Sequence, residues 1–336
     1  MIRFIYQKTQ ILLIHMAGEV KQTIIDIKKD SKKVMAASYP KKAPNMLVEK
    51  IKAFLSLVRI EHGLMVAVGV WVGALLAVKN ADFQLLILGA LPGVLVQMGA
   101  FAVNDLFDLE ADRANNRNER PLVNGILSPM FARNSAIVLF ILAVLLSLLL
   151  KLPAVCSIIV IASIIISIAY SYAMKNIAVL GNAYIAFSMA LPFVFGALVF
   201  NALHNDVIII AAVAFIAGLA REIMKTVQDM GGDVKARKAA TLPVLIGKTK
   251  SKIIASILYI FAIILSYVMF FSFNYSVFYV VVVTLGNIGL VASIVFSFDK
   301  KDEAKSMEKA RKLSLGGVFL ALISFLIEAI SKNMKP

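Results

Sequence analysis

The chain has 336 residues, of which 60% are hydrophobic and 16% charged, with a mean hydropathy of +0.85 and a formal net charge of +15. Soluble domains contain nearer half apolar residues, so this composition excludes an ordinary soluble protein and predicts a chain that lies mostly in lipid. The single cysteine, Cys156, sits inside an apolar run, which excludes a disulfide framework and a cysteine-based metal site.

The first 45 residues differ from the rest of the chain. They combine a short apolar stretch at 11–14 with several lysine pairs, and they lack the long apolar region and cleavage site of a signal peptide. We expect a disordered basic extension over 1–45 that lies against anionic lipid, followed by one domain over 46–336. An alternative is that translation begins at Met46 and that residues 1–45 are not native.

Runs of about 20 apolar residues can cross the hydrocarbon core of a membrane. Nine such runs are predicted, approximately over 62–78, 83–103, 131–150, 153–172, 178–200, 207–224, 253–271, 277–298 and 313–330. The expected fold is therefore an all-α integral membrane protein with nine transmembrane helices.

The basic residues are distributed unevenly between the loops. With nine spans, 31 of the 35 Lys and Arg residues fall on the side that carries the N-terminus. Because basic loops stay in the cytoplasm, this bias predicts a multi-pass protein of the cell membrane with its N-terminus inside and its C-terminus outside. The net charge then reflects topology, and a nucleic-acid partner is not expected.

An acidic cluster follows the second span. Positions i, i+3 and i+7 of a helix lie on one face, so Asp105, Asp108 and Asp112 form one stripe. Asn104 flanks this stripe with a neutral oxygen ligand. All four residues are predicted to lie at the cytoplasmic side.

A second acidic cluster follows the sixth span. Asp229 and Asp233 are i, i+4 neighbours if the helix continues through Gly231-Gly232, and Lys225 and Glu222 precede them on the same face. Matching clusters after spans two and six suggest two similar four-helix halves, spans one to four and five to eight, plus a ninth helix. Membrane proteins built from internal repeats commonly place their site between the repeats.

Oxygen ligands without organised histidine or cysteine suit a hard cation such as Mg²⁺, which usually binds one or two carboxylates together with substrate phosphate oxygens. Two such clusters could therefore hold a diphosphate through bridging metal. The predicted metal ligands, which are also the predicted catalytic residues, are Asp105, Asp108, Asp112, Asp229 and Asp233.

These motifs resemble the two signatures of the UbiA superfamily of intramembrane prenyltransferases. The first is Asn104-Asp-x-x-Asp108-x-x-x-Asp112 followed by Arg117 and Arg120-Pro121, and the second is Arg221-Glu222-Ile223-x-Lys225 leading to Asp229-x-x-x-Asp233. The likeness extends to Arg59, Tyr170, Lys175, Gly181-Asn182 and Thr241-Leu242-Pro243, and it covers roughly 46–332.

The resemblance implies nine helices around a central cavity, dependence on Mg²⁺, and transfer of a prenyl group from its diphosphate to a lipophilic acceptor. The expected phosphate donors are Arg117, Arg120, Lys175 and Lys225. Arg59 is the candidate for binding a phosphate on the acceptor, since a guanidinium can donate two parallel hydrogen bonds. Tyr170 is the aromatic residue most expected to shelter the allylic carbocation.

The run Arg221–Lys225 is similar to that of archaeal digeranylgeranylglyceryl phosphate synthases, which alkylate the free hydroxyl of a glycerol phosphate ether. This similarity predicts geranylgeranyl transfer to geranylgeranylglyceryl phosphate in archaeal ether-lipid synthesis. Two alternatives stay open: an aromatic prenyltransferase acting on a 4-hydroxybenzoate or another quinone precursor, and a lipid or ion transporter.

Two further ionisable residues stand out. His62 lies close to Arg59 and is a candidate for the site, with capping of the first span as the other interpretation. Glu328 lies near the outer end of the last span, where we expect its carboxylate to extend to the membrane surface.

Overall fold

The computed structural model describes residues 46–237 and 241–334, apart from the side chains of 231–237 and Met334. The contacts of the chain divide it into two units, Met1–Lys50 and Ile51–Pro336. Of the first unit only 46–50 are described, and they are helical. The predicted extension, 1–45, therefore lies outside the described residues, and the start of translation at Met46 stays a hypothesis.

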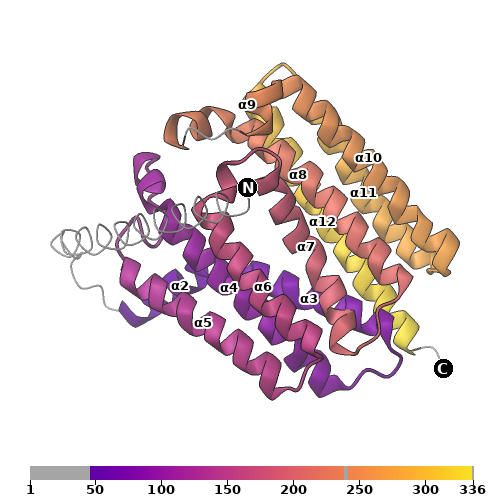
Figure 1. The fold of residues 1–336 in the computed structure, drawn as a ribbon. Helices are drawn as coiled ribbons and strands as arrows, with labels where there is room; N and C mark the ends of the chain where they lie inside the picture. Colours follow the sequence, from indigo (N-terminus) through magenta and orange to yellow (C-terminus); the bar gives the residue numbers. More distant parts are fainter. Residues whose placement is uncertain (1–45, 238–240, 335–336) are drawn as a thin grey trace, which may run out of the picture. The chain divides into compact units, whose positions relative to one another are not determined.

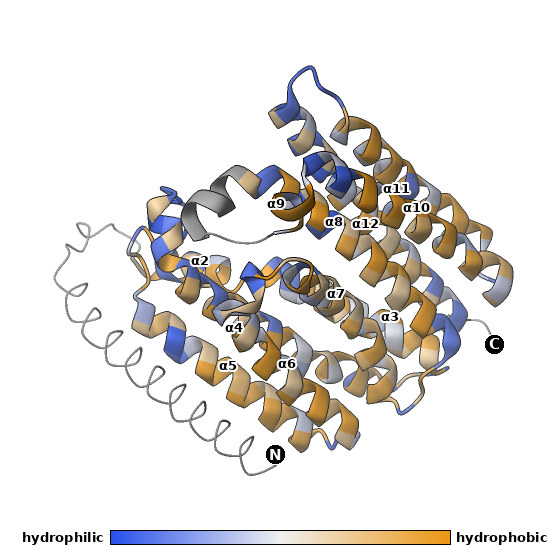
Figure 2. Ribbon diagram, turned by 45° about the horizontal axis from the view of Figure 1, so that its top comes forward, coloured by the Kyte–Doolittle hydropathy of each residue, from blue (hydrophilic) through white to orange (hydrophobic). Residues whose placement is uncertain are grey.

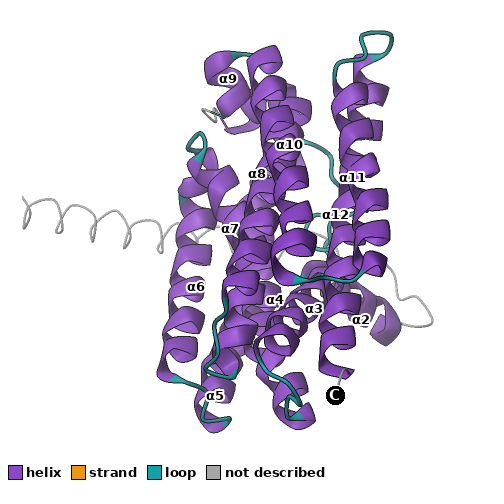
Figure 3. Cartoon of the chain, turned by 90° about the vertical axis from the view of Figure 1, so that its right-hand side faces the viewer, coloured by secondary structure: helices purple, strands orange, loops and turns teal. Residues whose placement is uncertain are grey.

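Every regular element among the described residues is a helix (Figure 3). The α-helices are α2 (Met46–Leu57), α3 (Ile60–Ala77), α4 (Phe83–Ala114), α5 (Pro129–Leu149), α6 (Ala154–Tyr172), α7 (Leu180–Val199), α8 (Asn205–Arg237), α9 (Leu242–Ile246), α10 (Lys248–Phe273), α11 (Val277–Ser297) and α12 (Glu303–Met334). A short 3₁₀ helix, η1 (Met174–Asn176), joins α6 to α7.

Nine helices in the described part are long and apolar enough to cross a membrane, namely α3 to α8 and α10 to α12. This confirms the predicted all-helical, nine-span fold. Figure 2 shows apolar residues along most of each helix and hydrophilic residues mainly at helix ends and loops. Large apolar side chains such as Ile158, Ile165 and Leu285 are exposed, as expected for surfaces that face lipid.

Side-chain caps fix the start of several spans. The Asp82 carboxylate accepts a hydrogen bond from the Leu85 backbone N–H at 2.6 Å, and the Ser128 hydroxyl accepts one from the Phe131 N–H at 3.1 Å. Such caps satisfy backbone donors that the first turn of a helix leaves without partners.

The two helices that carry the acidic clusters extend beyond their apolar runs. Helix α4 has 32 residues and continues through Asp112, and α8 has 33 residues and continues through Gly231-Gly232 to Arg237. The i, i+4 relationship of Asp229 and Asp233 along the backbone is therefore present.

Helices α3 and α7 pack unusually closely. A Cβ atom added at Gly73 would overlap the carbonyl oxygen of Phe193, and one added at Gly196 would overlap that of Val70. Small residues allow such direct contact of two backbones, which is a common means of helix association in membranes. This pair lies at the centre of the second unit, with α4 and α12 against α3 and with α8 against α7 (Figure 1).

The ninth helix is an integral part of the bundle. It packs along α11 and also contacts α3 and α8. At its end the Asn333 amide donates to the carbonyl oxygens of Leu75 and Val78, the latter at 3.1 Å. Helix α12 thus joins the first span to the sixth and the eighth.

The expectation that Glu328 reaches the membrane surface is wrong. Its side chain is fully buried and accepts hydrogen bonds from the backbone N–H of Ser276, at 3.0 Å, and from the Ser276 hydroxyl. Ser276 is the residue before α11, so the carboxylate lies at the positive end of that helix. Buried hydrogen-bond donors nearby hold the side chain inside the protein.

Candidate functional site

A cavity of about 810 Å³ lies within the second unit. It is lined by residues of α3, α4, α6, α7, α8, α10, α11 and α12. The expected central cavity is therefore present.

The cavity lining changes from polar to apolar along each of three helices. Successive spans run in opposite directions, so the start of α3 and the ends of α4 and α8 lie on the same side. On that side the lining includes Arg59, which precedes α3, His62 from α3, Asn104 from α4 and Lys225 from α8. Further along the same helices the lining is mostly apolar, with Val66, Gly69, Ala100, Val213, Ala214 and Ala217. The cavity therefore has a charged mouth and an apolar interior.

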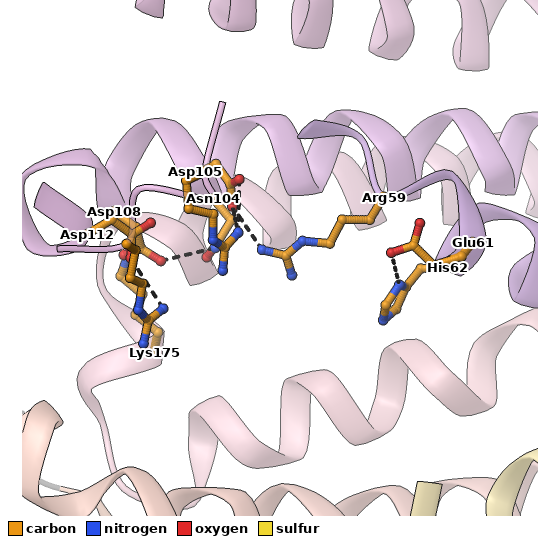
Figure 4. Close-up of polar contacts among 10 residues, drawn as sticks. Arg59, Glu61, His62, Asn104, Asp105, Asp108, Asp112 and Lys175 are labelled. Atoms are coloured by element: carbon orange, nitrogen blue, oxygen red, sulfur yellow. Dashed lines mark hydrogen bonds and ion pairs between the residues drawn. The ribbon is translucent and has the colours of Figure 1, made fainter. Parts of the chain in front are cut away.

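The first acidic cluster is buried and paired with cations. Asp105 is 3% exposed and binds two guanidinium groups: the Nη2 of Arg59 donates to its Oδ1 at 2.9 Å, and the Nη1 of Arg120 donates to both carboxylate oxygens at 2.7 and 3.0 Å. The loop after α4 brings Arg120 back against its own helix. Figure 4 shows the Arg59 side chain extending toward Asp105.

Asp108 and Asp112 have different cations. The Nζ of Lys175 donates to Asp108 Oδ1 at 2.7 Å, and the Asn104 amide donates to Oδ2 at 3.0 Å. The Nη1 of Arg117 lies 3.2 Å from Asp112 Oδ1, but this oxygen is buried and has no well-aligned hydrogen bond. The three carboxylates lie in a row along α4, as predicted (Figure 4).

The chemistry of these donors fits a hard divalent cation. They are oxygen ligands on one helix face, and Asp112 Oδ1 retains unused acceptor capacity. Among the described side chains, however, no three acidic, histidine or cysteine groups converge on one point. Asp105, Asp108 and Asp112 instead each face at least one cation, so a metal ion bound between them would compete with these ion pairs.

The second acidic cluster is described in part. Asp229 is half-buried near the end of α8, and the side chain of Asp233 lies outside the described residues. One and two turns before Asp229 on the same helix face, Lys225 and Glu222 line the cavity, and Lys225 Nζ lies 3.3 Å from Glu222 Oε2. The described side chains do not show whether the two acidic clusters meet, although α4 and α8 are in contact.

Arg59 has a backbone conformation that favours glycine. Its φ of 46° and ψ of 64° are left-handed, and it separates α2 from α3. The guanidinium lies over the Phe101 ring at 4.3 Å, within the range of a cation–π contact. Burial lowers the pKa of this guanidinium, and the carboxylate of Asp105 offsets part of that shift. Arginine nevertheless stays charged in proteins.

Tyr170 lies on the cavity wall. Its ring stacks on that of Tyr184 from α7, with 4.6 Å between ring centroids. His62 also lines the cavity, with its imidazole edge on Phe101 and its Nδ1 3.4 Å from Glu61 Oε1. His62 is therefore at the site, although its part in capping is not supported, since Arg59 holds the cap position.

Sequence reasoning gave no role to three cavity-lining residues, Tyr184, Arg221 and Glu222. The helical spacing of Glu222 from Asp229 placed Glu222 on the same helix face as the acidic cluster, and this spacing was the signal in the sequence that could have pointed to it. Tyr184 could not be singled out, because the chain has 9 tyrosines and 21 phenylalanines in similar apolar surroundings.

Comparison with known proteins identifies relatives over most of the chain. Residues 66–323 match the UbiA prenyltransferase family. The chain is similar to the digeranylgeranylglyceryl phosphate synthase of Archaeoglobus fulgidus, with 35% identity over 83% of this chain and 96% of that protein.

Two solved structures have the same fold. One, from work on digeranylgeranylglyceryl phosphate synthase in membranes, has a TM-score of 0.69 and 26% identity, covering 84% of this chain and 99% of that one. The other, a UbiA homologue from Archaeoglobus fulgidus bound to GPP and Mg²⁺, has a TM-score of 0.61 and 21% identity, covering 80% of this chain and 99% of that one. The chain therefore belongs to the UbiA prenyltransferase family and is a multi-pass membrane prenyltransferase.

Proposed function

We propose that this protein transfers a geranylgeranyl group from its diphosphate to the free hydroxyl of geranylgeranylglyceryl phosphate, in a reaction that depends on Mg²⁺. The observation that carries this proposal is the cavity, whose apolar interior suits prenyl chains and whose mouth is lined by cations, one of which, Arg59, pairs with the acidic cluster of α4. The relative at 35% identity, which is named for this synthase activity, supports the choice of acceptor.

The residues that would hold the metal are Asp105, Asp108, Asp112, Asp229 and Asp233. Mg²⁺ bound there would neutralise charge on the departing diphosphate. This assignment agrees with the UbiA homologue whose structure contains GPP and Mg²⁺, and with the unused oxygen of Asp112.

The basic residues would act directly on phosphate oxygens. Arg117, Arg120 and Lys175 each pair with a carboxylate of α4, at 3.2, 2.7 and 2.7 Å. When a diphosphate and its metal occupy the mouth, these donors can turn from the aspartates to the phosphate oxygens, with Lys225 donating from α8. Charge-assisted hydrogen bonds of this kind stabilise the anion as the carbon–oxygen bond breaks.

The apolar part of the cavity would protect the allylic carbocation from water. Its walls exclude competing nucleophiles, so that the acceptor hydroxyl captures the cation. The stacked rings of Tyr170 and Tyr184 present aromatic surface at this wall, where they can stabilise positive charge.

The charged mouth would open to the cytoplasm. The two substrates, both of which carry phosphate, would meet the membrane on that side. The excess of basic loops on the same side supports an N-terminus inside and a C-terminus outside. Accessibility of single cysteines introduced into the loops, in a Cys156→Ser background, would test this orientation.

The acceptor class is tested by comparing two acceptors in separate reactions. Purified protein in detergent is given geranylgeranyl diphosphate, Mg²⁺ and either geranylgeranylglyceryl phosphate or 4-hydroxybenzoate. We expect an ether product from the first and none from the second. Alkylation of the aromatic ring alone would assign the protein to quinone-precursor prenylation instead.

A further inference from the structure

Glu222 lies where the cavity changes character. Among the described side chains of α8, six line the cavity: Val213, Ala214, Ala217, Arg221, Glu222 and Lys225. The first three are apolar and the last three are charged. Glu222 therefore belongs to the boundary between the charged mouth and the apolar interior.

This boundary is the level at which the reacting carbon must lie. Glu222 precedes Asp229 by seven residues, which places it about 10 Å deeper along the same face of the helix. A prenyl diphosphate with its phosphates at the mouth directs its chain inward, so its C1 atom lies deeper than the phosphate-binding carboxylates. The free hydroxyl of the acceptor must approach C1 at that same level.

Two neighbouring cations on α8 hold the Glu222 carboxylate in place. It is 5% exposed, Arg221 Nη1 donates to its Oε1 at 3.0 Å, and Lys225 Nζ donates to its Oε2 at 3.3 Å. Each carboxylate oxygen can accept more than one hydrogen bond, so both keep a lone pair for another donor.

The other described carboxylate of the lining is Glu61. Its side chain is 65% exposed and pairs with His62, so it is closer to solvent than to the boundary. The aspartates of α4 each face a cation and are absent from the lining among the described residues. Glu222 is therefore the buried acceptor that the reacting hydroxyl can meet.

We propose that Glu222 is the general base that takes the proton of the acceptor hydroxyl as the new ether bond forms. This inference rests on the proposed transfer to a hydroxyl oxygen. The C1–oxygen bond to the diphosphate breaks with its electron pair going to the diphosphate, and the hydroxyl oxygen bonds to C1. The hydroxyl proton passes to the Glu222 carboxylate, which later releases it to water or to diphosphate at the mouth.

A carboxylate with two cationic neighbours is a sufficient base for this step. The oxygen that has bonded to a carbocation is a protonated ether, which is a strong acid, so even a weak base removes its proton. Correctly positioned general bases typically contribute 10²- to 10⁴-fold, an effect large enough to measure in one substitution.

The test measures breaking of the C1–oxygen bond of the prenyl diphosphate separately from capture of the carbocation by the acceptor hydroxyl. Glu222→Gln, Glu222→Asp and the unaltered enzyme are each assayed for ether formation. They are also assayed for exchange of bridging ¹⁸O in geranylgeranyl diphosphate into its non-bridging positions, with an acceptor analogue that lacks the free hydroxyl. That exchange reports breaking of the C1–oxygen bond without any proton transfer from the acceptor.

We expect Glu222→Gln to reduce kcat for ether formation by about 100-fold or more while leaving the isotope exchange and both KM values unchanged. Glu222→Asp should recover part of the rate. Glu328→Gln is the matched control, since it also neutralises a buried glutamate but lies away from the cavity, and its ether formation should be normal.

Two results would overturn the proposal. Equal loss of isotope exchange and ether formation would mean that Glu222 positions the diphosphate through Lys225. Near-normal ether formation in a folded Glu222→Gln enzyme would mean that another group, such as the diphosphate itself, takes the proton. Failure of the unaltered enzyme to alkylate geranylgeranylglyceryl phosphate would instead count against the proposed function.

Discussion

The ammonium of Lys175 lies 2.7 Å from an oxygen of Asp108, although 67 residues separate the two in the chain. Only 9% of the lysine side chain and 11% of the aspartate side chain are exposed. A position near a helix end would suggest a solvated carboxylate, but Asp108 is buried and paired with a lysine of η1. The pair therefore contributes both to the site and to the fold.

Substitution of Asp108 should show both contributions. Asp108→Ala is expected to abolish prenyl transfer and also to lower the thermal unfolding temperature in detergent. Breaking a buried ion pair by removing one partner costs roughly 3–5 kcal/mol, because the other charge stays buried. Asp229→Ala is the comparison, since Asp229 is only half-buried: it should abolish transfer with little change in unfolding temperature. Normal turnover in either variant would remove that residue from the metal site.

Metal and diphosphate should stabilise the protein together. The cations of Arg59, Arg120 and Lys175 already pair with the carboxylates of Asp105 and Asp108, so Mg²⁺ alone competes with them there. Inorganic diphosphate can engage those cations and free the carboxylates. We expect a clear rise in unfolding temperature with both ligands, a small rise with either one, and reversal by a chelator. At 100 times the dissociation constant the stabilisation is about 2.7 kcal/mol. An equal rise with Mg²⁺ alone would contradict this exchange of partners.

Arg59→Lys should distinguish the two substrates. Arg59 lines the cavity and donates one hydrogen bond to Asp105 Oδ1, and its planar guanidinium could donate two parallel hydrogen bonds to a phosphate, which an ammonium cannot reproduce. If it binds the phosphate of the acceptor, the substitution raises KM for that acceptor by about tenfold to a hundredfold, from a loss of roughly 1.5–3 kcal/mol. KM for the prenyl diphosphate should change little. Steady-state kinetics with each substrate varied will measure both KM values. An equal rise in the two KM values would mean that Arg59 contributes to the site only through its ion pair with Asp105.

Glu328 is expected to matter for stability and not for catalysis. Glu328→Ala removes the acceptor of two Ser276 hydrogen bonds at the start of α11, leaving the Ser276 backbone N–H and hydroxyl without that partner. The cost should be about 1–3 kcal/mol, seen as a lower unfolding temperature with normal turnover. Glu328→Gln retains a carbonyl oxygen that can accept from Ser276, so it should be the milder change. Loss of activity in a stable Glu328→Gln protein would show that this buried acid has a functional role.

Hydropathy predicted the helices because lipid requires each span to bury its backbone polar groups and to present apolar side chains. The ends of α4 and α8 were less predictable from hydropathy. Both helices continue for several turns beyond their apolar runs, and in α4 the acidic residues of this extension are paired with cations such as Arg120 and Lys175. Helical spacing, by contrast, correctly placed Asp105, Asp108 and Asp112 in one row.

The pairing of charges could not be predicted. Arg59 reaches Asp105 across 46 positions of the sequence, and Lys175 reaches Asp108 across 67. No local pattern specifies such partners, which depend on how α3, α4 and η1 pack. The burial of Glu328 was missed for the same reason, since its partner Ser276 lies 52 residues away at the start of another helix.

The contact between the backbones of α3 and α7 has a consequence for how the enzyme is made. These helices are the first and fifth spans, and the cavity has walls from both. A nascent chain that has delivered only four spans to the membrane therefore carries the whole first acidic cluster but has no enclosed chamber. The chamber begins to form when the segment around Gly196 has left the ribosome and packs against the helix that contains Gly73. Until then the carboxylates of α4 must lie beside lipid or water, because the fifth span, which forms part of the cavity wall, is absent.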